Sequence, residues 1–255
     1  MNTRQHKVLE AIVEIYTETA VPVGSNALAE RHGFDVSSAT LRNDMAQLEE
    51  EGFLYQPHIS AGRIPTDKGY RFYVEEMMGD QELSKEDQRR LQTELLMMKA
   101  KQTRLSRTTA KLLSTLSGNL AVMGDASKDE FYDFGIKELI EAPEFRELDE
   151  LCRLVETLDS LDEKFDVLLA TMKDDDVRIF IGEENPLAQI SKNCSMLVAP
   201  YRNQEGERGV LAIIGPKRMQ YAKNKSLLEY VKKILSSSSG TSLPIAAILF
   251  VKVIV

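Results

Sequence analysis

The sequence predicts an α+β protein made of two folded parts that a helical segment joins. The first 78 residues hold three short stretches with helical periodicity and then a glycine-containing hairpin. After residue 140, a long helical run precedes three β-rich runs and a last helix. That order is typical of helices flanking a small antiparallel sheet. At 255 residues, with 43% hydrophobic and 28% charged, the chain is long enough for two domains.

Capping residues and glycines set the expected helices of the first part. Helices are predicted over residues 3–19, 26–32 and 38–51, each with a polar residue placed to cap its first turn: Thr3, Ser25 and Ser37. Gly33 and Gly52 follow the second and third helices, where a glycine suits the chain reversal.

A basic turn follows the third helix. In residues 56–73, Pro57 and Pro65 bracket a compact turn, with Arg63 expected at its tip. Thr66 can cap a new helix directly afterwards. A strand, a basic turn and a helix in this order are what the wing of a winged helix-turn-helix module needs, so the N-terminal part is predicted to be one.

The third helix then becomes the candidate recognition helix. Its buried stripe is expected to be Leu41, Met45 and Leu48, which leaves Ala39, Asn43 and Ala46 on the opposite side. Asn43 offers the donor and acceptor pair that suits an adenine edge, and Arg42 suits guanine or a phosphate. A solvated helix face carrying a chance Arg-Asn pair is the alternative, but the preceding helix and the following wing favour DNA contact.

A set of DNA-binding residues follows from this arrangement. Arg42, Asn43 and Gln47 are expected to read base edges. The expected phosphate contacts are Ser25, Ser37, Ser38, Thr40, Arg63, Lys68 and Arg71, and His58 and Ser60 of the turn complete the set.

Several stretches resemble one known family. They are PVGS (22–25), SSATLRNDMAQLEEEGFL (37–54) and QPHISAGRIPTDKGYRFYV (56–74), and later EAPEFRELDEL (141–151), IGEEN (181–185) and GVLAIIGPKRMQY (209–221). They resemble the heat-inducible transcription repressor HrcA family. The resemblance implies a winged-helix repressor of chaperone genes that binds double-stranded DNA, an inverted-repeat operator, as a homodimer. It also implies a GAF-like C-terminal domain and support of the active repressor by the GroE chaperonin.

The resemblance and the residue patterns together divide the chain. The expected parts are a winged-helix domain (1–78), a linker helix (79–120), a GAF-like domain (121–235), and a serine linker with an apolar tail of unassigned role (236–255). The apolar stripe of 84–117 suits one helix that packs on its own domain or pairs with a second chain. Residues 118–129 are expected to form a loop. The family's inserted dimerisation domain would begin there, so the chain is expected to be a short form that lacks most of it.

The C-terminal part is predicted in more detail. A helix is expected from Pro143 to about residue 172, strands over 177–181, 195–201 and 209–214 with a turn at Gly206, and a helix over 217–235. The segment GPKRM (215–219) could hold an anion at a helix start, although a structural turn is favoured. The acidic run 174–176 indicates a solvated loop rather than a metal site.

Charge and composition limit the classes of function that the sequence supports. The net charge is −8, and residues 1–78 hold 7 Lys+Arg against 12 Asp+Glu, so any DNA contact must use a local basic surface. Three histidines and two distant cysteines give no zinc pattern, no catalytic constellation stands out, and no cofactor or enzyme activity is expected. A reduced, cytoplasmic setting is predicted, with no membrane span, because the apolar tail 243–255 is shorter than the ~20 residues that a span needs.

Two other functions stay open at this point. The C-terminal domain could sense a small molecule and report it through the DNA module. Alternatively, the chain could be a protein-interaction module that has lost DNA binding.

Overall fold

The N-terminal part begins with three helices. The computed structural model describes residues 1–101, 105–125, 130–145, 161–186, 192–203 and 205–237. The helices are α1 (Thr3–Thr19), α2 (Ser25–His32) and α3 (Ser38–Glu50). Ser37 caps α3 as predicted, but the other two expected caps are wrong. Asn2 caps α1 in a reciprocal pair with Gln5, and α2 begins after Gly24 without a side-chain cap.

The predicted wing is a short hairpin followed by a helix. Strands β1 (Leu54–Tyr55) and β2 (Ile64–Pro65) pair antiparallel. Thr66 then caps α4 (Asp67–Phe72), as the sequence indicates, because its hydroxyl accepts the backbone N–H of Gly69. A single π-helical turn, η1 (Tyr73–Met77), continues α4 and ends the N-terminal part.

The C-terminal part is one antiparallel sheet between helices. Its helices are α5 (Lys85–Lys101), α6 (Leu105–Ser117), α7 (Ile136–Glu141), α9 (Leu161–Ala170) and α10 (Tyr221–Ser236), with short 3-10 turns η2 (Pro143–Phe145) and η3 (Gly182–Glu184). Its strands are β3 (Leu120–Asp125), β4 (Glu130–Phe134), β5 (Arg178–Ile181), β6 (Cys194–Arg202) and β7 (Arg208–Pro216). They lie in the order β4-β3-β7-β6-β5, and each pair is antiparallel.

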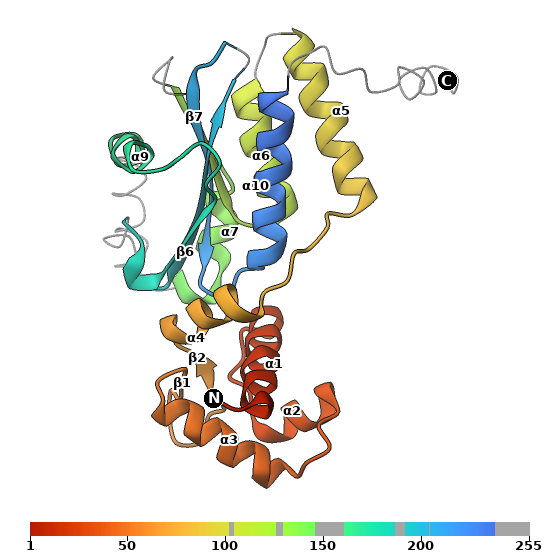
Figure 1. Cartoon of the computed structure of the whole chain (residues 1–255), viewed down its shortest axis with the longest axis vertical. Coiled ribbons are helices and arrows are strands. Elements are labelled where there is room, and N and C mark those ends of the chain that lie inside the picture. The colour runs from red at the N-terminus through yellow and green to blue at the C-terminus, as the bar shows by residue number, and fades with distance from the viewer. Residues whose placement is uncertain (102–104, 126–129, 146–160, 187–191, 204, 238–255) are drawn as a thin grey trace.

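Alternating side chains give the sheet two buried faces. On β7, Leu211 and Ile213 belong to the core that α6 and α10 cover, whereas Val210, Ala212 and Ile214 belong to a second core with Phe145 of η2 and Phe165 of α9. Figure 1 shows α6 and α10 on one side of the sheet and α9 on the other. The α+β class predicted from the sequence is therefore confirmed.

Two expectations about residues 84–129 are wrong. The single helix over 84–117 is two helices, α5 and α6, which pack against each other and against α10. Leu91, Leu95 and Leu112 of the predicted stripe are buried within the chain. The expected loop 118–129 contains β3, a strand that lies between β4 and β7. Its apolar run of only four residues, 120–123, was too short to reveal a strand buried on both faces.

The strands expected in the C-terminal part agree with the structure, and the last helix begins four residues later than predicted, at Tyr221. The three predicted strands correspond to β5, β6 and β7, and Gly206, at φ 81°, lies in the turn between the last two. Of the helix predicted over 143–172, the structure describes the 3-10 turn η2 at its start and α9 near its end, whereas residues 146–160 lie outside the described residues. The tail beyond residue 237 also lies outside them. Within those residues, none of the helices has the length and apolarity needed to cross a bilayer.

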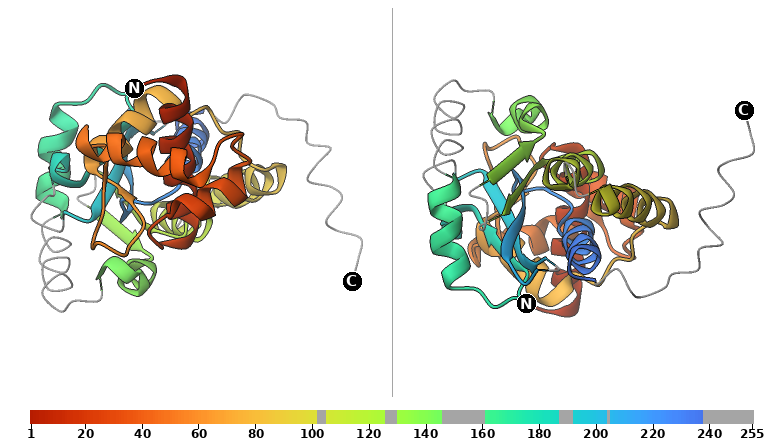
Figure 2. Two further views of the ribbon diagram at one scale, coloured as in Figure 1. Left: turned by 90° about the horizontal axis from the view of Figure 1, so that it is seen from below. Right: turned by 90° about the horizontal axis from the view of Figure 1, so that it is seen from above.

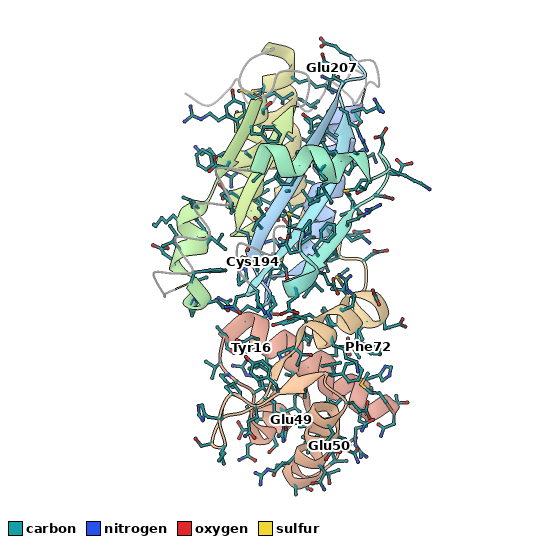
Figure 3. All side chains as sticks on the ribbon, turned by 90° about the vertical axis from the view of Figure 1, so that its left-hand side faces the viewer. Tyr16, Glu49, Glu50, Phe72, Cys194 and Glu207 are labelled. Carbon is teal, nitrogen blue, oxygen red and sulfur yellow. The ribbon has the colours of Figure 1, made fainter. Side chains whose placement is uncertain are left out.

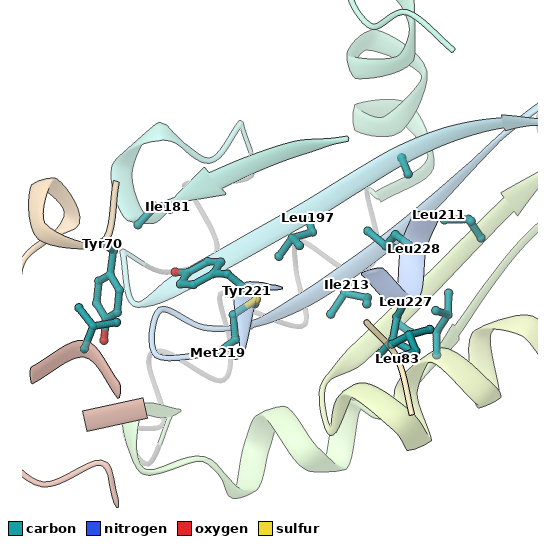
Figure 4. Close-up of a cluster of buried hydrophobic side chains, with 14 of the residues drawn as sticks. Tyr70, Leu83, Ile181, Leu197, Leu211, Ile213, Met219, Tyr221, Leu227 and Leu228 are labelled. Carbon is teal, nitrogen blue, oxygen red and sulfur yellow. The ribbon is translucent and has the colours of Figure 1, made fainter. Parts of the chain in front are cut away.

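The two parts meet through α4 and the start of α10. Tyr70 of α4 and Tyr221 of α10 lie with their rings 6.0 Å apart, and both side chains are buried. Figure 4 shows this pair at one end of the core, with Leu197 and Ile213 farther along the same sheet face. The buried core is therefore continuous between the two parts, and the sheet fixes the position of α4.

Candidate nucleic-acid interface

Helix α3 turns its apolar stripe inward and its polar face to solvent. Leu41, Met45 and Leu48 are at most 1% exposed, as the periodicity predicts. Arg42 and Asn43 are exposed, and within the described residues neither makes a side-chain hydrogen bond or ion pair. α3 lies at the end of the molecule farthest from the sheet (Figure 1), and the view from below shows it unobstructed (Figure 2, left). Both side chains are therefore available to a large ligand.

The N-terminal end of α3 adds an anion site to this face. The Ser37 hydroxyl accepts the Thr40 backbone N–H at 3.2 Å and lies 3.0 Å from the Thr40 hydroxyl. Ser38 is the first helical residue and is partly exposed. The unpaired N–H groups and the positive end of the helix dipole favour a phosphate here.

Two polar side chains on α3 are fixed by α1. Asp44 is buried, and its carboxylate accepts two hydrogen bonds from the Arg4 guanidinium, at 2.6 and 3.1 Å. Gln47 is exposed, but its side-chain oxygen accepts a 2.6 Å hydrogen bond from buried Gln5. This bond occupies the Gln47 side-chain oxygen, so the amide nitrogen of this exposed side chain remains as its donor.

Glu49 connects the recognition helix to the wing. Its carboxylate accepts hydrogen bonds from the Arg63 side chain at 2.8 Å and from the Gln56 backbone N–H at 3.2 Å. Figure 3 shows Glu49 in the part of the molecule that lies below the sheet. The periodicity of α3 does not indicate these contacts of Glu49, because they depend on how the hairpin folds back onto α3.

The expected position of Arg63 at the tip of the wing is wrong. Arg63 precedes β2, and its backbone pairs with that of Val23 in an isolated bridge. Its side chain is only 14% exposed and is paired with Glu49. Arg63 thus holds the base of the wing, and it is not a free cation beside the DNA.

The other expected wing cations are also used inside the protein. Lys68 donates to the Glu51 carbonyl at 2.7 Å, at the C-terminal end of α3, and its ammonium lies 4.2 Å from the Phe53 ring centre. Arg71 donates to the Ile179 carbonyl at 2.7 Å and pairs with Glu184, so it faces the C-terminal part. These contacts correct the expectation for Arg71, which faces the C-terminal part, whereas Lys68 is exposed beside the C-terminal end of α3.

The three remaining expected residues lie in different surroundings. Ser25, at the start of α2, is 7% exposed. His58 and Ser60 are exposed in the loop between β1 and β2, where the imidazole Nδ1 lies 3.1 Å from the serine hydroxyl. The structure thus groups the α3 residues on one face, places His58 and Ser60 on the wing, buries Ser25, and turns Arg71 toward the C-terminal part.

The GPKRM segment is a structural turn whose cations join the two parts. Lys217 donates to Asp67 of α4 at 2.5 Å. Arg218 donates to Glu144 at 2.6 Å and to the Thr17 carbonyl of α1 at 3.4 Å. Because both cations are already paired, the structure supports the turn that was favoured over the anion site.

Internal pairing changes the electrostatics of the candidate interface. The net charge of residues 1–78 is negative, but two of the carboxylates on α3, those of Asp44 and Glu49, are neutralised by Arg4 and Arg63. Of the three acidic residues of α3, only exposed Glu50 is not paired with an arginine in the described residues. A local basic surface is possible on an acidic chain because opposite charges in contact largely cancel at a distance.

Comparison of the sequence with known proteins identifies a family. Residues 71–224 match the family model described as "HrcA protein C terminal domain". A protein of Arthrobacter sp. (strain FB24) named "Heat-inducible transcription repressor HrcA" is 51% identical over 120 residues, which cover 47% of this chain and 35% of that protein. A protein of the same name from Pelotomaculum thermopropionicum is 26% identical, and that alignment covers 92% of this chain and 96% of the relative.

Two further facts concern length and fold. The Pelotomaculum alignment is 335 positions long although this chain has 255 residues, so the relative has segments that the chain lacks. A crystal structure titled "Crystal structure of a hypothetical protein at 2.2 A resolution" superposes with a TM-score of 0.70 at 22% identity, covering 92% of this chain and 96% of that one. The overall fold is therefore shared with a solved protein. By the match over residues 71–224, the chain belongs to the HrcA family.

Proposed function

We propose that this chain is a transcription repressor of heat-shock genes that binds an inverted-repeat DNA operator as a homodimer. The observation that carries the proposal is the exposed, unpaired Arg42-Asn43 pair on a helix whose opposite face is buried. The names of the curated relatives supply the repressor activity and its heat inducibility. A second subunit would bind the other half-site of the operator. A protein that binds chromosomal DNA would act in the cytoplasm.

The proposed contacts divide by chemistry. Asn43 and Arg42 would read base edges in the major groove, with Gln47 held for the same task by Gln5. Ser37, Ser38 and Thr40 would hold a phosphate at the N-terminal end of α3. We leave Arg63, Lys68 and Arg71 out of the direct contacts, because their cations already have partners in the protein.

Selection of duplexes from a random pool tests this proposal. The wild-type protein should enrich an inverted repeat, and its mass in solution with that duplex should show two subunits per site. Asn43→Ala should lower affinity by ~1–3 kcal/mol and relax preference at one position in each half-site. Glu50→Ala is the matched control, since Glu50 is an exposed residue at the other end of the same helix.

Either of two results would contradict the proposal. One is a wild-type protein that enriches no sequence and shifts no duplex, which would favour a protein-interaction module. The other is an Asn43→Ala variant that keeps the full base preference, which would remove α3 from sequence recognition. Support by the GroE chaperonin is a separate proposal, checked by whether GroEL and GroES raise the fraction of protein that binds operator.

The small-molecule sensor is the alternative function. A cavity of about 300 Å³ lies in the N-terminal part, where α1 and the end of α2 supply Glu10, Glu14 and His32. The sensor hypothesis instead expects the ligand to bind in the C-terminal domain. Within the described residues, both faces of the sheet are packed with apolar side chains. A thermal-shift screen of metabolites checks it, since a ligand at ~100 times its Kd adds ~2.7 kcal/mol of stability.

A further inference from the structure

The tip of the wing is held in one shape by its own hydrogen bonds. The Gln56 side-chain amide donates to the Ile59 carbonyl at 3.1 Å and to the Ala61 carbonyl at 2.6 Å. The Ala61 backbone N–H donates to the His58 carbonyl at 2.8 Å, which closes a turn around the tip. A loop ordered in this way has already lost the conformational entropy that binding would otherwise cost.

The base of the wing is fixed to the recognition helix. Glu49 of α3 receives both the Gln56 backbone N–H and the Arg63 side chain. Gly62 lies so close to the segment before α2 that an added Cβ would be 2.3 Å from the Val23 carbonyl carbon. The direction of the tip relative to α3 is therefore set by the fold.

This rigid tip presents an apolar side chain. Ile59 is 98% exposed, the highest value among the large hydrophobic residues that the structure describes. Residues 56–62, QPHISAG, contain no lysine, arginine, aspartate or glutamate. A single exposed isoleucine is ordinary by itself. Here it stands at the end of a fixed loop beside a recognition helix, and the loop lacks the cations that would grip phosphates.

We infer that Ile59 packs into the DNA minor groove next to the half-site that α3 reads, against the deoxyribose walls and the groove floor. The inference rests on the proposed function. In homeodomains a segment attached to the helical unit reaches the adjacent minor groove while the recognition helix occupies the major groove. The wing is such a segment, because Glu49 joins it to the C-terminal end of α3. Apolar side chains, isoleucine among them, are used in minor-groove contacts. The β-branched side chain is also stiff, so little rotamer freedom is lost on binding.

The contact should select bases by shape. In the minor groove, a G·C pair differs from an A·T pair by the guanine 2-amino group, which projects from the floor. An isoleucine seated on the floor would collide with that amino group or lose its contact there. Ile59 would thus favour A·T pairs flanking each half-site without forming a hydrogen bond to any base.

Inosine substitution tests this contact directly. An I·C pair has the major-groove face of G·C but no 2-amino group. Fluorescence anisotropy would compare A·T, I·C and G·C at each flanking pair of the duplex selected by the wild-type protein. At one flanking position, the wild type should bind the A·T and I·C duplexes roughly five-fold more tightly than the G·C duplex, as expected for partial burial of one isoleucine.

Two variants separate the apolar contact from other effects. Ile59→Ser should lose the preference by weakening A·T and I·C binding while leaving G·C binding unchanged, and Ile59→Val should keep most of it. The dependence of affinity on salt should be the same for all three proteins, because no phosphate contact is removed. Since Ile59 is exposed, the melting temperatures should also agree.

Several outcomes would overturn the inference. One is an Ile59→Ser variant with the wild-type preference, and another is a salt slope lower by about one unit, which would indicate a backbone contact instead. A loss of dimer mass in Ile59→Ser without DNA would identify the tip as a contact between two copies of the chain. These results differ from failure of the proposed function itself, in which the wild-type protein would enrich no duplex at all.

Discussion

Replacing Tyr70 by phenylalanine should stabilise the protein. Tyr70 is 1% exposed, and its hydroxyl has no hydrogen-bond partner among the described residues. A buried polar group without a partner costs ~1–3 kcal/mol. Phenylalanine would keep the ring contact with Tyr221, whose centroid is 6.0 Å away. We therefore expect the free energy of unfolding to rise by about 1 kcal/mol and the melting temperature by about 2–4 °C.

Tyr221→Phe is the matched control at the same junction. The Tyr221 hydroxyl lies 2.8 Å from the Ser195 hydroxyl and donates to the Lys217 carbonyl at 2.5 Å. Its removal leaves the buried Ser195 hydroxyl without this partner. We expect this variant to lose about 1–2 kcal/mol, opposite in sign to the Tyr70 variant.

Alkaline titration gives a second measure of the same two hydroxyls. Burial raises the pKa of both Tyr70 and Tyr221. Above pH ~10 an unfolded tyrosine is ionised, while the folded state keeps its proton until the higher folded pKa is reached. Below pH ~10 neither tyrosine makes the free energy of unfolding depend on pH. Above that value each buried tyrosine lowers the free energy of unfolding by about 1.4 kcal/mol per pH unit, until its folded pKa is reached.

Urea unfolding, followed by circular dichroism at pH 8 and at intervals above pH 10, would measure both effects. Above pH ~10, the free energy of unfolding of Tyr70→Phe should fall less steeply with pH than that of the wild type. The difference in slope should be ~1.4 kcal/mol per pH unit, the contribution of one buried tyrosine. The reasoning is refuted if Tyr70→Phe destabilises the protein as much as Tyr221→Phe does. An unchanged alkaline slope would also refute it, because Tyr70 would then not be held neutral by burial.

Two further predictions concern ion pairs. Arg63→Met should weaken binding to every duplex, because the wing is displaced. Adding Glu49→Gln to this variant should recover part of the lost affinity. The slope of log affinity against log salt concentration should stay within a fraction of a unit of the wild-type slope. A slope lower by ~0.9 would show instead that the guanidinium neutralises a phosphate. Lys217→Met and Asp67→Asn should each lower the free energy of unfolding, and a double-mutant cycle should give a coupling of about 0.5–3 kcal/mol. Additive effects would mean that the pair contributes nothing to joining the two parts.

Helix α3, the proposed recognition helix, was predictable because its determinants are local. The cap at Ser37, the stripe Leu41, Met45 and Leu48, and the exposed Asn43 depend on positions within one helix of 13 residues. The hairpin and the Thr66 cap follow for the same reason, since turns and caps are set by a few adjacent residues. Here periodicity gave the correct element and the correct outward face.

The errors all involve contacts between distant segments. Periodicity in residues 84–117 identified helical residues but not the break between α5 and α6. Those helices separate because each buries leucines against α10, as Leu91, Leu95 and Leu112 show. The strand β3 was missed because its pairing with β7 joins residues 120–125 to residues 209–214. Nothing in the local sequence reports a partner that far away.

By itself, the sequence determined which residues lie on the outward face of α3, the proposed DNA-reading face of this HrcA-family chain. Only the tertiary structure decided which charges remain available on that face. Arg63 is neutralised by Glu49, 14 residues earlier, and Asp67 is held by Lys217, 150 residues later. Side chains of opposite charge pair wherever the packed backbone brings them within a few ångströms, and sequence spacing does not encode that distance. The wing's free end is therefore apolar Ile59, while its arginine supports it from inside.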